Sequence, residues 1–67
     1  MQLFAVISHR AIANFEAREY GSDYIDLSLG DQVELLNAPG GQEADADWSY
    51  GCAGSRGIGW FPTRFVH

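Results

Sequence analysis

The chain has 67 residues, of which 46% are hydrophobic and 19% are charged, and its formal net charge is −5. This length allows one small globular domain and leaves little room for a deep catalytic pocket. The acidic balance, with four Arg and no Lys, disfavours nucleic acid and anionic membranes as partners, because their phosphates repel an acidic surface.

Short apolar segments separated by a polar loop make up the N-terminal part. Residues 3–7 are an apolar run without the basic start of a signal peptide, so we expect residues 1–10 to be an extension or a first strand. The domain is expected over residues 11–67. It starts with the mainly apolar residues 11–15, and the polar residues 16–23 follow with a Gly-Ser turn signal.

Two segments with alternating apolar residues come next. Ile25, Leu27 and Leu29 recur at period two, which predicts a strand with one shared face. After a Gly-Asp break, Val33 and Leu35 alternate with polar residues and predict a second strand.

The C-terminal half predicts a loop, a hairpin and a helical turn. Residues 37–47 form a loop rich in Gly, Pro and acidic residues. Residues 48–53 and 58–61 are predicted strands, joined by a tight turn at residues 54–57. The next proline cannot donate to a ladder and ends the strand, and residues 63–65 are expected to form one helical turn.

No window has a sustained helical period, and about five short strands with turns between them indicate an all-β barrel or sandwich. The side chains expected to face the core are Ala11, Ile25, Leu27, Val33, Leu35, Gly51, Ala53, Ile58, Phe61 and Val66.

Five segments in order carry a family resemblance. They read AIANF at 11–15, YIDLSLGD at 24–31, VELL at 33–36, WSYG at 48–51 and GWFPTRFV at 59–66. Together they resemble the SH3 (Src-homology 3) family over nearly the whole chain. The resemblance implies a small five-stranded barrel with RT, n-Src and distal loops and a short 3-10 turn near the C-terminus.

The same resemblance implies a protein-interaction module that binds proline-rich P-x-x-P segments in the polyproline II conformation, an already extended helix that is ordered at little entropic cost. Trp48 is the strongest candidate, because its indole would divide the proline slots from a specificity pocket and can donate a hydrogen bond. The groove positions carried over are Ala13, Phe15, Trp48, Trp60, Pro62, Arg64 and Phe65.

Carboxylates of the RT and n-Src loops would form the specificity pocket for an Arg or Lys that flanks the proline core. The alternative is an acidic surface that serves solubility. The preferred carboxylates are Glu16, Glu19, Asp23, Asp26 and Asp47, with Glu43 and Asp45 beside them.

Departures from the family pattern bear on affinity. Ala13 stands where an aromatic ring usually lines the groove, so one wall is lost unless Tyr20 or Tyr24 moves in. Phe15 and Phe65 replace tyrosines whose hydroxyls usually bond the ligand. Arg64, in place of an asparagine, could bind a ligand carbonyl or acid, or pair with a loop carboxylate and partly close the groove.

Other functions have weaker support. A Cys52–His9 catalytic pair has no third group, and an Asp/Glu metal site at residues 43–47 matches no known calcium loop, so we expect no enzyme, cofactor or metal. The altered groove leaves open a module that binds a non-proline motif, a folded partner or its own host protein. The single cysteine fits a reducing compartment, and we expect a monomeric domain of a larger cytoplasmic scaffold, cytoskeletal or signalling protein.

Overall fold

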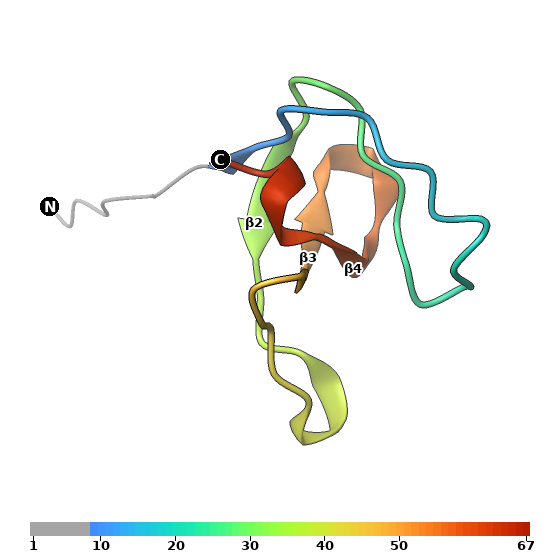
Figure 1. The fold of residues 1–67 in the computed structure, drawn as a ribbon, viewed down its shortest axis with the longest axis vertical. Helices are drawn as coiled ribbons and strands as arrows, with labels where there is room; N and C mark the ends of the chain where they lie inside the picture. The colour runs from blue at the N-terminus through green and yellow to red at the C-terminus, as the bar shows by residue number, and fades with distance from the viewer. Residues whose placement is uncertain (1–8) are drawn as a thin grey trace, which may run out of the picture.

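A computed structural model describes residues 9–67, so the apolar run at residues 3–7 lies outside the described residues. The described chain is a small all-β fold built on one four-stranded antiparallel sheet with the order β1-β2-β3-β4 (Figure 1). The strands are β1 (His9–Arg10), β2 (Gln32–Leu35), β3 (Trp48–Ala53) and β4 (Ile58–Pro62).

The predicted hairpin of β3 and β4 is confirmed. Its register places Tyr50 opposite Trp60 and Trp48 opposite Pro62. The turn is the 3-10 segment η2 (Gly54–Arg56), which is closed by a 3.2 Å hydrogen bond from the Ala53 N–H to the Gly57 carbonyl. The predicted helical turn near the C-terminus is also present, as the 3-10 segment η3 (Thr63–Phe65).

Residues 25–29 do not form the continuous strand that their alternation predicts. Phe15 and Leu27 instead form an isolated bridge, in which each backbone N–H donates to the other's carbonyl at 2.9 and 3.0 Å. Leu27 is buried, whereas Leu29 is 68% exposed, so the prediction for Leu29 is wrong. The physical reason is a tight turn: the Asp31 N–H donates to the Ser28 carbonyl at 2.9 Å, which places Leu29 at the turn and outside the ladder.

The core is filled by alanine, branched aliphatic and phenylalanine side chains from the strands and from the loop residues before β2. Its buried members are Ala11, Phe15, Ala17, Ile25, Leu27, Val33, Ala53 and Phe61, with Tyr24, Trp48, Phe65 and Val66 packed against them. The predictions for Leu35 and Ile58 are wrong, since they are 47% and 58% exposed. Leu35 lies opposite Gly51, which has no side chain to cover it. Ile58 precedes the buried Gly59, and alternation points it to the opposite face.

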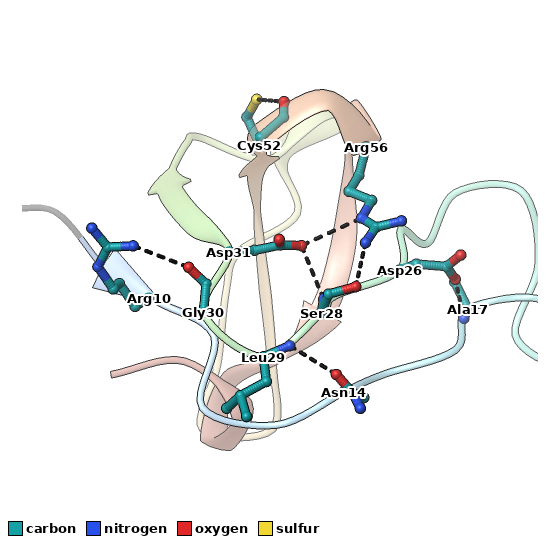
Figure 2. Close-up of polar contacts among 11 residues, drawn as sticks. Arg10, Asn14, Ala17, Asp26, Ser28, Leu29, Gly30, Asp31, Cys52 and Arg56 are labelled. Carbon is teal, nitrogen blue, oxygen red and sulfur yellow. Dashed lines mark hydrogen bonds and ion pairs between the residues drawn. The ribbon is translucent and has the colours of Figure 1, made fainter.

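Polar contacts tie the turn after Leu27 to the β3–β4 hairpin (Figure 2). The Asp31 carboxylate accepts hydrogen bonds from the Ser28 N–H at 2.9 Å and from the Arg56 Nε at 3.3 Å, and Arg56 also contacts the Ser28 hydroxyl. These contacts favour the ionised carboxylate and lower the pKa of Asp31, and the hydrogen bond from the Ser28 N–H has the largest effect. Partial burial acts in the opposite direction, and Arg56 adds a smaller lowering of the pKa.

The two ends of the described chain meet. Arg10 and His67 exchange backbone hydrogen bonds of 3.1 and 2.9 Å, and the Ile12 N–H donates to the Phe65 carbonyl at 2.7 Å. Figure 1 accordingly shows the C-terminus beside the start of the described chain. Residues 37–47, which contain the 3-10 segment η1 (Pro39–Gly41), project away from the sheet and return at Trp48.

Candidate functional site

Trp48 is the centre of an aromatic cluster at the start of β3. Its ring centroid lies 5.2 Å from that of Tyr24, 5.3 Å from that of Tyr20 and 6.1 Å from that of Phe15. Phe15 in turn lies 6.1 Å from Phe65. Trp48 is half-buried because one side packs on the core while the rest reaches the surface. Loop residues, β3 and η3 thus build one aromatic cluster, in which Phe15 is buried and Tyr20 is the most exposed ring.

A surface pocket of about 260 Å³ lies on one side of Trp48. We call it the Phe65 pocket; its lining residues are Phe15, Tyr20, Ala46, Asp47, Trp48, Pro62, Arg64 and Phe65. It therefore brings together groove candidates from the first segment, β3 and the C-terminal turn, which are far apart in the sequence.

A second surface pocket, of about 390 Å³, also has Trp48 in its wall. We call it the Trp60 pocket; its lining residues are Tyr24, Gln42, Glu43, Asp45, Trp48 and Trp60. Trp48 is the residue that both pockets share. Both have aromatic walls, but the Trp60 pocket holds two carboxylates and no cation, whereas the Phe65 pocket holds one carboxylate and the Arg64 guanidinium.

Asp45 fixes the end of the projecting loop beside Trp48. Its Oδ1 atom accepts hydrogen bonds from the backbone N–H of Trp48 at 2.7 Å and of Asp47 at 2.8 Å. These two N–H groups, in that order, stabilise the ionised carboxylate and lower the pKa of Asp45. The Thr63 hydroxyl donates to the Asp45 carbonyl at 3.1 Å, so the loop is also tied to η3.

Two candidates of the aromatic groove lie apart from the Phe65 pocket. Trp60 lines the Trp60 pocket and packs edge-on against Tyr50, with the ring centroids 5.2 Å apart. Ala13 is half-buried and lines neither of the two pockets.

The predicted carboxylates are not gathered at one point. Asp47 lines the Phe65 pocket, and Asp23 lines a further pocket that shares Trp60 with the Trp60 pocket. Glu16 forms an exposed ion pair with Arg18, with 3.5 Å between Oε2 and Nε. The remaining two line neither named pocket: Glu19 is exposed, and Asp26 accepts the Ala17 backbone N–H at 2.7 Å.

Tyr20 and Tyr24 line the two pockets but were not among the groove positions that the sequence predicted. The sequence suggested them only as substitutes for the ring missing at Ala13. A turn in which the Tyr20 N–H donates to the Ala17 carbonyl at 2.8 Å brings Tyr20 to Phe15, 5.4 Å between centroids. No periodicity marks such a loop contact, so only the aromatic residue type was available as a signal.

Comparisons with protein-family models, with curated proteins and with solved structures find no match to this chain. The candidate site therefore rests on the residues and geometry of this chain alone.

Other chemistry has little support in the described part of the chain. Within residues 9–67, no three His, Cys, Asp or Glu side chains are grouped so that they could hold a metal ion. The Cys52 thiol contacts the Gly54 carbonyl at 3.9 Å. None of the helices in the described residues has the length and apolar character needed to cross a membrane.

Proposed function

We propose that this chain is an SH3-type domain that binds proline-rich segments of other proteins through the surface around Trp48. The observation that carries the proposal is the pair of aromatic-walled pockets that share the Trp48 indole, one of which also holds the carboxylates of Glu43 and Asp45. Aromatic rings on a rigid frame suit the flat rings of proline, and carboxylates suit a flanking Arg or Lys. In this proposal the module catalyses nothing and is a monomeric part of a larger cytoplasmic protein.

Backbone pairing outside the four strands supports a barrel rather than an open sheet. Residues 10–12 pair with residues 65–67 at one side. At the other side, the Trp60 N–H donates to the Asp23 carbonyl at 2.9 Å and the Ile25 N–H donates to the Trp60 carbonyl at 3.0 Å. The two edge strands of the sheet, β1 and β4, thus both have backbone partners, as closure of a barrel requires.

The spacing of the rings agrees with a polyproline II ligand. The centroids of Phe65, Phe15 and Trp48 follow one another in steps of 6.1 Å. Polyproline II rises by about 3.1 Å per residue, so each step corresponds to about two ligand residues. Because Phe15 is 7% exposed and belongs to the core, a ligand would contact the half-buried rings of Phe65 and Trp48, with Phe15 packed against both.

The charge distribution favours a basic flank on the ligand. Glu43 and Asp45 lie in the wall of the Trp60 pocket, and the chain as a whole has a net charge of −5. A ligand Arg in this pocket would gain a charge-assisted contact, and the net charge would raise the rate of encounter at low salt.

The test is an NMR titration of the isotopically labelled chain with three peptides: a P-x-x-P peptide flanked by Arg, the same peptide flanked by Glu, and the Arg-flanked peptide with both prolines replaced by alanine. We expect the Trp48 and Trp60 indole N–H signals to shift strongly with the first peptide only. Because exposed charge contacts are screened, added salt should weaken this binding.

Absence of shifts with all three peptides would refute proline-rich binding and favour a non-proline motif or a folded partner. Equal shifts with the Arg and Glu flanks would retain the groove but reject the acidic pocket as the source of specificity.

A further inference from the structure

Arg64 places a cation at the aromatic end of the proposed groove. It belongs to η3, is exposed and lines the Phe65 pocket. Its guanidinium carbon lies 5.4 Å from the centroid of the Phe65 ring. A guanidinium held near a ring in this way keeps its N–H groups available for a further partner.

The other three arginines have polar partners within the molecule. Arg10 donates to the Gly30 carbonyl at 3.0 Å, and Arg18 and Arg56 form ion pairs with carboxylates at 3.5 and 3.3 Å. Within residues 9–67, Arg64 forms no ion pair with a carboxylate. Among these four arginines, all within the described residues, Arg64 is the one without a carboxylate or carbonyl partner, and it lines the Phe65 pocket.

The carboxylate that shares the Phe65 pocket with Arg64 is that of Asp47. Its backbone is beside η3, since the Thr63 N–H donates to the Asp47 carbonyl at 2.9 Å. The two charged side chains nevertheless form no ion pair, and the pocket between them is open. This geometry opposes the sequence-based alternative in which Arg64 and a loop carboxylate close the groove.

The charges are therefore distributed unequally along the groove. The Trp60 pocket holds the two carboxylates of Glu43 and Asp45, whereas the Phe65 pocket holds the Arg64 guanidinium together with the Asp47 carboxylate. We propose that the ligand carries a carboxylate at the end that occupies the Phe65 pocket, opposite its basic flank. This inference rests on the proposed function, and it specifies a ligand with an acidic end and a basic end.

The proposed contact is between the N–H groups of Arg64 and a carboxylate, which match in geometry and charge. The carboxylate can belong to a Glu or Asp side chain or to the C-terminus of the ligand chain. A side-chain carboxylate and a C-terminal carboxylate have the same chemistry, so the experiment tests each of them separately.

The experiment measures affinity by calorimetry for peptides with a P-x-x-P core, Arg at one end and Glu, Gln or Lys at the other. Each peptide is made in both chain directions, because a polyproline II helix can enter a groove either way. Capped and uncapped C-termini separate the side-chain source from the terminal source. The proteins are the unchanged chain, Arg64→Gln, Arg64→Glu and, as a matched control, Arg18→Gln, which removes an exposed arginine that lines neither named pocket.

We expect the Glu peptide or the free C-terminus to bind the unchanged chain about two- to five-fold more tightly than its neutral counterpart, as for an exposed ion pair. Arg64→Gln should abolish this preference, Arg64→Glu should transfer it to the Lys peptide, and Arg18→Gln should leave it unchanged.

Equal affinities of the Glu, Gln and Lys peptides for the unchanged chain would overturn the inference while leaving the proposed function intact. A uniform loss for all peptides in Arg64→Gln would also overturn it, because the side chain would then act through packing. Failure of every peptide to bind would refute the proposed function and, with it, this inference.

Discussion

At the scale of single residues, Trp48 has a structural and a surface role together. Its indole packs on the core, on Tyr24 and on Phe15, while the exposed remainder divides the two pockets. Tyr20 is different, since it is 51% exposed and touches Trp48 and Phe15 from the loop side. Tyr20 therefore supplies an exposed aromatic wall to the Phe65 pocket.

We expect Tyr20→Ala to weaken the binding of an Arg-flanked P-x-x-P peptide by about ten-fold, because an exposed aromatic wall typically contributes strongly to a small interface. Tyr20→Phe should retain most of the affinity, since the ring is preserved. Leu29→Ala, which removes another exposed apolar side chain away from both pockets, is the control. Calorimetry checks all three, and an unchanged affinity in Tyr20→Ala would exclude Tyr20 from the site.

Asp31 connects a single titration to stability. Its pKa is lowered in the folded chain by the Ser28 N–H and by Arg56. The contribution of Asp31 to the free energy of unfolding is therefore fully present above its unfolded-state pKa of about 3.9. This contribution is lost as the pH falls through the lower pKa of the folded state. Asp45, whose pKa is also lowered, acts in the same direction.

We accordingly expect the free energy of unfolding to decrease as the pH falls below about 4, and Asp31→Asn to make this decrease smaller. At neutral pH the variant should be less stable than the unchanged chain, and the two should converge in strong acid. Urea denaturation across this pH range measures both. Parallel curves at all pH values would contradict the role given to Asp31.

At the scale of elements, the pairing of β2 with β3 leaves no room for a side chain at Gly51. A Cβ atom placed there would collide with the Glu34 carbonyl oxygen and would lie 3.3 Å from the Leu35 Cα atom. The backbone of β2 cannot move away without breaking its pairing with β3, so this glycine is required by space. Gly54 in the hairpin turn has open space around it, so a side chain would meet no neighbour there. A glycine is favoured at this position because its φ is 52°, in the left-handed region.

We expect Gly51→Ala to lower the free energy of unfolding by about 3 kcal/mol, the upper part of the range for over-packing. Gly54→Ala should cost only about 1 kcal/mol, the penalty for a left-handed residue with a side chain. Urea denaturation gives both values, and amide exchange should accelerate at the β2–β3 pairs in Gly51→Ala alone. Equal effects of the two substitutions would contradict the close approach.

At the scale of the whole molecule, the fold depends on contacts between distant parts of the chain. The C-terminal residues pair with the first described segment: Val66 bridges Ala11, and His67 exchanges hydrogen bonds with Arg10. The same pairing holds η3 in place, and with it Phe65 and Arg64 at the candidate site. Stability and the shape of the groove are therefore linked.

We expect removal of residues 66 and 67 to cost about 4 kcal/mol, from three backbone hydrogen bonds and part of a valine side chain. Val66→Ala, which keeps the hydrogen bonds, should cost only about 1 kcal/mol. Thermal or urea unfolding compares the two variants. A truncated chain as stable as Val66→Ala would show that the terminal pairing contributes little.

The sequence by itself determined the all-β class, the β3–β4 hairpin, the helical turn after Pro62 and much of the core. These features follow from local signals: alternation, turn residues and the missing proline N–H, which act over a few residues. It also named most of the residues that line the Phe65 pocket, although those came through the order of motifs rather than through periodicity.

Only the tertiary structure decided which of those residues meet. Alternation could not show that Leu29 lies in a turn, or that Leu35 is left uncovered by Gly51, because both depend on what lies opposite in another segment. The contact of Tyr20 with Trp48 depends on the path of a loop. The lack of an Arg64–Asp47 ion pair depends on side-chain positions set by long-range pairing, about which a residue's neighbours in sequence carry no information.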